Sequence, residues 1–461
     1  MGQDGREASE KEDPMARTAT RWVRVGAAAA GIAAAGMAAA LTAAPAMAAE
    51  VTETQYIFNT LSFLMHGFLV MWMAAGFAML ESGLVRSKNT AAICLKNLTL
   101  YSIAGLMYFM VGYNLMYDGV DGGFAGSLSW WSADNPEALK GNFEAGYAAQ
   151  SDWFFQMVFV ATAASIVSGA LAERVKVWTF FVFVVFLTGI VYPIQGAWLW
   201  GGGWLAEMGF ADFAGSTIVH STGGWAALTG AIIVGARKGK YDHAGRVLPL
   251  PGSNLPLATL GTFILWLGWF GFNGGSQLAL GTAPDAIAIA TVYVNTNMAA
   301  AGGVLAAMAA TQLIYKKADL SFALNGAIAG LVSITAAPHT PSLGAALVIG
   351  AVGGILVVVF VPLFDRLRVD DVVGAVSAHL VAGIWGTMAV PFTNAEASFS
   401  TQAVGIAAIG ASVAAASAAL WLVLKHTIGV RVSEEEEEMG LDRAELGMEA
   451  YPEFGRGSQM F

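Results

Sequence analysis

Apolar segments of roughly 20 residues, each long enough to cross a membrane as a helix, recur along most of this chain. Short polar breaks separate them. Only 12% of the 461 residues are charged, whereas soluble proteins carry about 25%. The sequence therefore predicts an all-α polytopic membrane protein.

Charge and cysteine content exclude other classes. The formal net charge is −10 and the basic residues are scattered in short loops, which excludes a nucleic-acid binder. The single cysteine, Cys94, excludes a disulfide framework and a cysteine metal site. The sequence also lacks the H-E-x-x-H and G-x-S-x-G patterns of hydrolytic enzymes, so we expect neither an enzyme nor a cofactor.

The first 48 residues have the features of a secretory signal peptide. Three arginines between residues 17 and 24 precede an alanine-rich apolar run, which ends in small residues at Ala48. We expect residues 1–48 to be leader and signal peptide, with Met15 as a possible true start. The alternative is an additional transmembrane helix.

Eleven apolar segments follow this leader. They lie near residues 56–80, 91–117, 151–172, 177–199, 213–236, 255–276, 287–315, 320–337, 342–364, 374–392 and 401–425. An odd number of crossings places the two ends of the mature chain on opposite sides of the membrane.

Basic residues gather in alternate loops between these segments. One set of loops holds Arg86, Lys88, Arg174, Lys176, Arg237, Lys238, Lys240, Arg246, Lys316, Lys317, Arg366 and Arg368. The other set holds only Lys140, next to several acids. Because cytoplasmic loops are enriched in Lys and Arg, we expect the N-terminus outside and the C-terminus inside, in the cell inner (plasma) membrane. A cleaved signal peptide predicts the same orientation.

A short pattern, Gly-x4-His-x3-Gly, occurs at residues 215–224 and again at residues 374–383. These segments close two consecutive groups of five helices, and an odd number of crossings inverts the second group. Inverted repeats place a substrate path between the two halves near the membrane midplane. We therefore expect a 5+5 inverted repeat plus a final helix, with His220 and His379 facing each other inside the bilayer.

Ionisable side chains inside a membrane are costly and point to function. Paired neutral imidazoles, such as those of His220 and His379, can line a pore and relay a proton while the path stays uncharged. The alternative is a structural hydrogen bond to a neighbouring helix. Asp212 lies eight residues before His220 at the outer start of its helix, where it can also act as an N-cap.

Aromatic residues share helix faces with a hydroxyl group. Trp269, Phe272 and Ser276 lie at i, i+3 and i+7, and Phe155 and Phe159 lie at i and i+4. Such faces usually pack or contact lipid, but at an outer mouth they would suit a small cation held by cation–π attraction.

Four segments carry a resemblance to a known family. Residues 82–89 (SGLVRSKN), 169–174 (GALAER), 211–220 (ADFAGSTIVH) and 268–276 (GWFGFNGGS) resemble the ammonium transporter (Amt) branch of the Amt/Rh/Mep family. The resemblance extends from near residue 55 to near residue 452 and includes the tail that begins RVSEE.

The resemblance implies homotrimers of eleven-helix protomers with one narrow pore each. By motif, it implies roles for nine residues: twin pore histidines His220 and His379, a phenylalanine gate of Phe159 and Phe272, an ammonium recruitment site of Trp200, Phe155 and Ser276, pore-lining Trp269, and Asp212 as a structural or deprotonating acid. Trp198 is a rival to Trp200, because both lie at the outer end of the same segment.

The helix of the second histidine departs from the family pattern. Val372 stands where many members have proline, Leu380 follows His379 where glycine is common, and Ala382 replaces a frequent cysteine. We expect conduction to survive, since the histidine is retained, and helix packing and rate near His379 to be affected.

The resemblance implies an ammonium transporter made of a membrane domain at 49–428 and a cytoplasmic regulatory tail at 429–461. Ammonium, or its analogue methylammonium, would bind outside and lose a proton, and ammonia would then pass the gate and the histidines, with separate proton relay. The alternative is an ammonium sensor that signals through the tail, to which a PII-type nitrogen signalling protein would bind. From its run of five glutamates alone, the tail could equally be a solvated segment.

Overall fold

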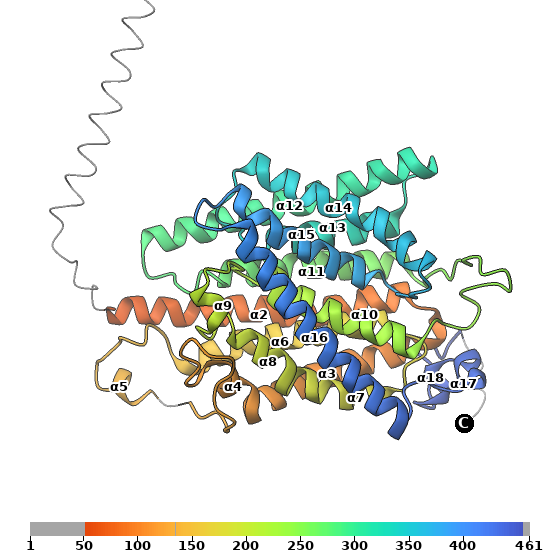
Figure 1. Cartoon of the computed structure of the whole chain (residues 1–461), viewed down its shortest axis with the longest axis horizontal. Coiled ribbons are helices and arrows are strands. Elements are labelled where there is room, and N and C mark those ends of the chain that lie inside the picture. The colour runs from red at the N-terminus through yellow and green to blue at the C-terminus, as the bar shows by residue number, and fades with distance from the viewer. Residues whose placement is uncertain (1–50, 134, 455–461) are drawn as a thin grey trace, which may run out of the picture. The chain divides into compact units, whose positions relative to one another are not determined.

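The computed structural model describes residues 51–133 and 135–454, and the described residues from Thr52 onward form one compact unit (Figure 1). The predicted signal peptide lies outside the described residues, so its cleavage remains a prediction.

Helices account for the regular secondary structure of the described residues, among which no β-strand occurs. The longer helices are α2 (Glu53–Leu84), α3 (Thr90–Met107), α6 (Ala149–Ala170), α7 (Val177–Phe186), α10 (Thr222–Val234), α11 (Leu255–Gly275), α12 (Ala283–Tyr315), α13 (Leu320–Ile334), α14 (Leu343–Arg366), α15 (Ala382–Ala389) and α16 (Phe399–Thr427). The short helices are α4 (Tyr113–Tyr117), α5 (Pro136–Leu139), α8 (Tyr192–Ala197), α9 (Trp204–Glu207), α17 (Glu434–Met439) and α18 (Leu441–Ala444).

Several helices continue through π-helical or 3₁₀ turns. The π-helical turns are η2 (Tyr108–Gly112), η3 (Leu187–Val191), η4 (Ser216–Ser221) and η5 (Val376–Val381). The 3₁₀ turns are η1 (Ser87–Asn89) and η6 (Val390–Phe392). A π-helical turn adds one residue to the turn and often occurs at functional sites.

Each of the eleven predicted segments contains a helix. Nine helical stretches within the described residues are long and apolar enough to cross a membrane. The two other apolar stretches, Leu320–Ile334 and Val376–Phe392, are shorter. The all-helical membrane fold is confirmed, whereas the count of eleven crossings and the orientation of the ends remain predictions.

Long apolar side chains lie on the outside of these helices. Trp178 is 79% exposed, Leu98 70% and Phe263 63%, which would be unfavourable in water but suits contact with lipid. Polar side chains lie inside instead, among them Asn273 and Thr335, which are fully buried and hydrogen-bonded to each other. This inside-out distribution is what a membrane protein with a polar path requires.

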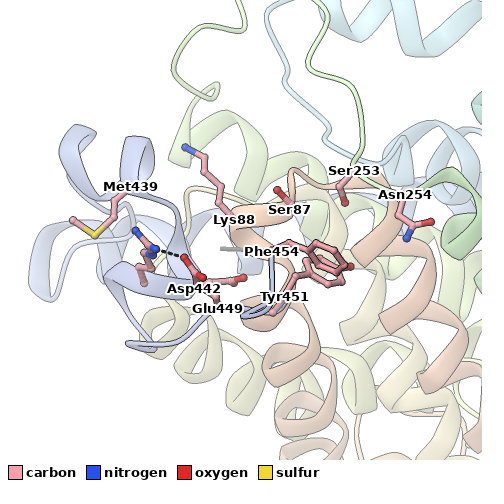
Figure 2. A pocket seen from close by; sticks show the side chains of 11 residues that line it. Ser87, Lys88, Ser253, Asn254, Met439, Asp442, Glu449, Tyr451 and Phe454 are labelled. Atoms are coloured by element: carbon pink, nitrogen blue, oxygen red, sulfur yellow. Dashed lines mark ion pairs between the residues drawn. The ribbon is translucent and has the colours of Figure 1, made fainter. Parts of the chain in front are cut away.

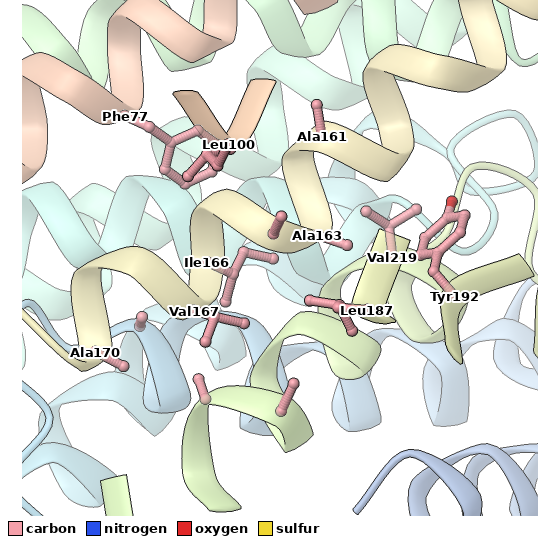
Figure 3. Packing of buried hydrophobic residues seen from close by; sticks show 14 of the residues in the cluster. Phe77, Leu100, Ala161, Ala163, Ile166, Val167, Ala170, Leu187, Tyr192 and Val219 are labelled. Atoms are coloured by element: carbon pink, nitrogen blue, oxygen red, sulfur yellow. The ribbon is translucent and has the colours of Figure 1, made fainter. Parts of the chain in front are cut away.

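Helices distant in sequence pack against one another in groups (Figure 1). Helix α2 packs along α11 and against α6, α12 packs with α13 and α14, and α16 packs on α10. Helix α6 is buried along most of its length. Figure 3 shows Ala163, Ile166 and Val167 of α6 in the main buried cluster together with Val219 of η4.

Glycines on one face of α11, among them Gly268 and Gly271, allow a close helix contact. A Cβ atom at Gly271 would lie 2.5 Å from Cβ of Leu69 and 2.6 Å from the carbonyl oxygen of His66, and one at Gly268 would meet Met73. Backbones can approach this closely only where the side chain is absent. The contact between α2 and α11 brings the face of α11 that carries Phe272 toward α6.

Candidate functional site

The two histidines lie side by side in repeat-related π-helical turns. Each turn follows a glycine with left-handed backbone, Gly215 at φ 106° and Gly374 at φ 80°, a conformation that favours glycine. The Nδ1 atoms of His220 and His379 are 3.3 Å apart, and the ring centroids are 5.2 Å apart at an interplanar angle of 27°. The predicted meeting of the two histidines is thus present in the structure.

A hydrogen bond between two Nδ1 atoms requires opposite tautomers. One ring must carry its proton on Nδ1 and donate it, while the other accepts with its Nδ1 lone pair. Nε2 of His220 has no hydrogen-bond partner within the described residues, so it is available to a molecule in the path. Both rings are buried, so the neutral form fits this site.

Asp212 organises the turn before His220. Its carboxylate accepts hydrogen bonds of 2.8 to 3.1 Å from four successive backbone N–H groups, those of residues 215–218. Burial raises the pKa of Asp212 to about 6, against the opposing effect of those hydrogen bonds. The backbone oxygen of Asp212 also accepts a 3.0 Å hydrogen bond from Nε1 of Trp200. Asp212 therefore connects the histidine turn to Trp200.

Asp371 occupies the matching position in the second repeat, eight residues before His379. Its Oδ2 accepts a 2.7 Å hydrogen bond from the backbone N–H of Val376, and burial raises its pKa to about 6. We did not select Asp371 from the sequence, although the shared spacing from aspartate to histidine could have identified it.

Aromatic rings cover the histidine pair on one side. Phe159 and Phe272 are stacked with centroids 4.0 Å apart at 27°, and Phe272 lies 5.1 Å from the ring of His220. Trp269 stacks on His220 at 4.8 Å, and its Nε1 donates a 2.8 Å hydrogen bond to Oγ1 of Thr335. All three aromatic side chains are fully buried, and the stacked pair packs directly against the ring of His220.

A cavity of about 380 Å³ lies beyond the phenylalanine pair. Its lining residues are Tyr113, Tyr117, Tyr147, Asp152, Phe155, Gln156, Phe159, Trp200, Phe213, Ser276 and Leu278. We name it the outer cavity, after the predicted orientation. The three residues of the expected recruitment site all line it.

The geometry distinguishes the two rival tryptophans. Trp200 lines the outer cavity, and its ring meets Phe159 edge-on at 6.0 Å. Nε1 of Trp198 instead donates a 2.9 Å hydrogen bond to the carbonyl oxygen of Phe124, and its ring contacts Phe124 and Trp204. Of the two, Trp200 is therefore positioned to contact a molecule in the cavity.

Ser276 presents a hydroxyl to the same cavity. Its Oγ donates a 2.8 Å hydrogen bond to the backbone oxygen of Phe272, which leaves its lone pairs available to a donor. Sequence reasoning missed the polar residues opposite, Asp152 and Gln156, and the three tyrosines. The position of Asp152 on the same helix face as Phe155 and Phe159 was the available signal.

A much smaller cavity, of about 20 Å³, lies on the other side of His379. We name it the inner cavity; Phe77, Glu81, Asn325 and Val373 are among the residues that line it. Oε2 of Glu81 accepts hydrogen bonds from Ser168 Oγ at 2.8 Å and Asn97 Nδ2 at 3.2 Å. The histidine pair thus separates a roomy cavity from a nearly closed one.

A buried ion-pair cluster surrounds the start of the second repeat segment. Arg237 is 2.8 Å from Asp370 and 3.4 Å from Glu173, and Glu173 also pairs with Arg86. Burial alone would raise the pKa of Asp370, but hydrogen bonds and charge from Arg237 hold that pKa well below its usual value. This cluster fixes the loops that flank the inner cavity.

The C-terminal tail contacts the helices through residues between Arg431 and Glu445. Glu437 is buried, accepts a 2.7 Å hydrogen bond from Arg431, and accepts another of 2.6 Å from the backbone N–H of Lys238. Asp442 accepts the backbone N–H groups of Ala91 and Ala92 at the start of α3. This part of the tail is therefore docked through Glu437 and Asp442, whereas Glu434, Glu435 and Glu438 in the run of glutamates remain exposed to solvent.

Between the tail and the helix starts lies a cleft of about 580 Å³. Figure 2 shows Asp442, Glu449, Tyr451 and Phe454 of the tail on one side. Ser87, Lys88, Ser253 and Asn254 lie across from them. Arg443 within the cleft pairs with Glu449.

Leu380, which follows the second histidine, packs against Gly224, which follows the first histidine. A Cβ atom at Gly224 would lie 2.6 Å from Cβ of Leu380, so Gly224 in the first repeat makes room for the second. Val372 is half-buried against the apolar cluster of Val85, Ile93 and Ala172. Close packing thus accommodates these two departures from the family pattern, and the third, Ala382, is fully buried. The effect of the three on the rate stays a prediction.

Comparison with known proteins identifies the family. Residues 61–451 match the Ammonium Transporter Family. Ammonium transporter Amt2 of Archaeoglobus fulgidus is 40% identical over 419 residues, covering 84% of this chain and 87% of that protein. A solved structure named Sensor Amt Protein superposes with a TM-score of 0.79 at 37% identity and covers 85% of this chain and 98% of its own. The structure of Candida albicans Mep2 gives a TM-score of 0.73 at 25% identity, covering 84% and 89%.

The match spans nearly all of the described residues, including the repeat segments, the outer cavity and most of the tail. The relatives are named as transporters, which agrees with the expectation of transport in place of catalysis. The chain therefore belongs to the ammonium transporter family.

Proposed function

We propose that this chain carries ammonium, as the cation or as ammonia, across the cytoplasmic membrane, with its N-terminus outside and its C-terminus inside. Ammonium binds first in the outer cavity. The rings of Trp200 and Phe155 attract the cation through their faces, and the hydroxyl of Ser276 accepts one of its N–H groups.

A charged ion cannot continue from there at low cost. Phe159 and Phe272 stack across the path, and moving a bare cation among buried apolar rings carries a large desolvation penalty. Ammonium gives one proton to water in the outer cavity, which removes that penalty. Neutral ammonia then passes the phenylalanine pair and takes up a proton again on the inner side. Asp212 holds the turn in place and, in this mechanism, positions the site where the proton leaves.

The histidine pair is the observation that carries this proposal. Two neutral imidazoles joined by a 3.3 Å hydrogen bond, buried beside a stacked phenylalanine pair, offer ammonia one donor and one acceptor. Proton hopping along the same pair, reset by tautomer exchange, can carry that proton inward separately from ammonia, which makes transport electrogenic.

The test is a transient current from proteoliposomes on a solid-supported membrane after an ammonium pulse, with potassium as the ion control. The His220→Ala, His379→Ala double variant is compared with His426→Ala, a histidine near the end of α16 and away from the path. We expect a current for ammonium only, and loss of that selectivity in the double variant alone. No ammonium flux by the wild type, electrical or chemical, would refute transport.

A sensor function is the second candidate, since one similar solved structure is named Sensor Amt Protein and the tail is packed against the helices. Uptake of labelled methylammonium by cells that lack their own ammonium transporters separates the two. Uptake at wild-type protein levels supports transport, whereas no uptake with a nitrogen-dependent signalling output supports a sensor.

We further propose a homotrimer and a tail that binds a PII-type nitrogen signalling protein. The exposed apolar helix faces can contact lipid or another copy of the chain, and the tail borders the cleft of Figure 2. Native mass spectrometry tests the trimer. A pull-down with and without residues 430–461 tests the partner.

A further inference from the structure

Asp152 places a carboxylate in the wall of the outer cavity. It lies in the first turn of α6, three residues before Phe155, and only 6% of its surface is exposed. None of the expected recruitment residues carries a negative charge. Asp152 is therefore the acidic side chain of a cavity otherwise lined by aromatic, amide, hydroxyl and apolar groups.

No basic partner offsets this carboxylate within the part of the chain that the structure describes, where the ion pairs involve other acids. Its hydrogen-bond donors are neutral: the hydroxyl of Tyr113 to Oδ2, and Nε2 of Gln156 to Oδ1 at 3.4 Å. A position in the first turn of a helix compensates a negative charge only in part. A buried charge left unpaired is costly. The carboxylate of Asp152 would therefore be stabilised by a cation bound in the cavity.

The surrounding tyrosines are suited to supply the rest of a cation site. Tyr113 and Tyr117 have ring centroids 5.1 Å apart, and Tyr147 lines the same cavity. The buried hydroxyl of Tyr117 has no hydrogen-bond partner among the described residues. Aromatic faces and a free hydroxyl oxygen both favour a cation that carries N–H donors.

We propose that Asp152 forms a second cation subsite in the outer cavity, with Tyr117 and Tyr147, and that it takes ammonium. The weakly engaged Oδ1 accepts one N–H of the ammonium ion, and the tyrosines contact the others. A single carboxylate without a second acid selects a monovalent cation over Mg²⁺ or Ca²⁺, which require several oxygen ligands. The subsite concentrates ammonium beside Trp200, Phe155 and Ser276.

The role in transport rests on the proposed function, but binding can be tested without it. Ammonium chloride is titrated into the purified protein in detergent at constant ionic strength, with intrinsic tryptophan fluorescence as the readout and potassium chloride as the ion control. Asp152→Asn keeps the shape of the side chain and an acceptor for Tyr113. Glu144→Gln, an exposed acid in the loop before α6, is the matched control.

We expect Asp152→Asn to weaken ammonium binding about tenfold, because a charge-assisted hydrogen bond is lost, and Glu144→Gln to bind like the wild type. Asp152→Glu should recover part of the affinity, and Tyr117→Phe should lose a smaller part. If Asp152→Asn does not fold, the ammonium affinities of Asp152→Glu and Tyr117→Phe still test the proposal. Wild-type affinity in Asp152→Asn, or in both other variants, would overturn the proposal.

Transport gives the second readout. The concentration of ammonium at half-maximal current should rise about tenfold in Asp152→Asn, with the maximal current retained, because the chemistry beyond the phenylalanine pair is untouched. Asp152-dependent binding without any wild-type transport would refute the transport function and leave the subsite standing. Wild-type transport with an unchanged half-maximal concentration in Asp152→Asn would refute the subsite and leave transport standing.

Discussion

The two repeat-related segments, 212–224 and 371–383, share one local plan and differ in their surroundings. Each begins with an aspartate whose carboxylate accepts backbone N–H groups, continues through a left-handed glycine and places a histidine in a π-helical turn. The first segment adjoins a cavity of about 380 Å³ and the second one of about 20 Å³.

The difference follows from what holds each aspartate. Asp212 accepts four backbone N–H groups and contacts Trp200 through its backbone oxygen. Asp371 accepts fewer backbone N–H groups, those of Val376 and Ala375, and its neighbour Asp370 is bound to Arg237. The same motif thus holds both histidines, while a buried ion pair lies next to the second aspartate and an aromatic side chain contacts the first.

Replacement of the aspartates, Asp212 and Asp371, should show the difference between the two segments most strongly. Asp212→Ala leaves four buried N–H groups without their acceptor, and each costs about 1–3 kcal/mol. We expect a loss of more than about 4 kcal/mol in the free energy of unfolding. Asp371→Ala should lose about 1–3 kcal/mol. Denaturant titration in detergent measures both, and equal losses would contradict the comparison.

Asp370→Asn should rank next, at about 3 kcal/mol, because it removes one partner of a buried ion pair. The folded pKa of Asp370 lies below its unfolded value. The contribution of Asp370 to the free energy of unfolding is therefore complete above about pH 4, and it is lost as the pH falls toward the folded pKa. The stability difference between wild type and variant should be constant near neutral pH and shrink below about pH 4.

Asp371, the neighbouring acid, is a control for which the pH dependence of stability has the opposite sign. The pKa of Asp371 is raised to about 6, so the folded protein binds more protons than the unfolded chain between about pH 4 and that value. Relative to Asp371→Asn, the wild type should gain stability as the pH falls through this window. Parallel pH profiles for the two variants would show that the two carboxylates do not differ as described.

The glycines at the crossing of the two segments test their mutual packing. A Cβ atom at Gly224 would lie 2.6 Å from Leu380 Cβ, and one at Gly383 would meet the backbone oxygen of Ser216. Each Gly→Ala change should cost about 1–3 kcal/mol through overpacking. Gly344→Ala, where a Cβ has open space, is the control and should be near neutral in thermal unfolding.

The smallest effect concerns the tail. Glu437→Gln weakens the contacts with Arg431 and with the backbone of Lys238, which should raise hydrogen exchange of residues 430–454 and leave α10 protected. We expect about 1–2 kcal/mol of local stability to be lost. Glu435→Gln on the exposed side of the same helix should change exchange very little. Similar exchange in the two variants would argue against a fixed tail.

Much of the site was predictable because its signals are local. The spacing of Trp269, Phe272 and Ser276 on one helix face, and the repeated Gly-x4-His-x3-Gly pattern, depend only on helix geometry. Asp152 and Asp371 were missed for a different reason. A single acid near a helix end usually caps it or faces solvent, so the local signals, the helix face shared with Phe155 for Asp152 and the spacing to His379 for Asp371, did not by themselves indicate a buried role.

The sequence by itself determined the membrane class, the helical segments and the candidate residues, because apolar length, charge distribution and periodicity act along the chain. The tertiary structure decided which of Trp198 and Trp200 reaches the cavity, how closely His220 and His379 meet, and that the glutamate-rich tail is docked. These outcomes depend on contacts between segments far apart in sequence. Their energies come from burial and pairing, which no local pattern specifies.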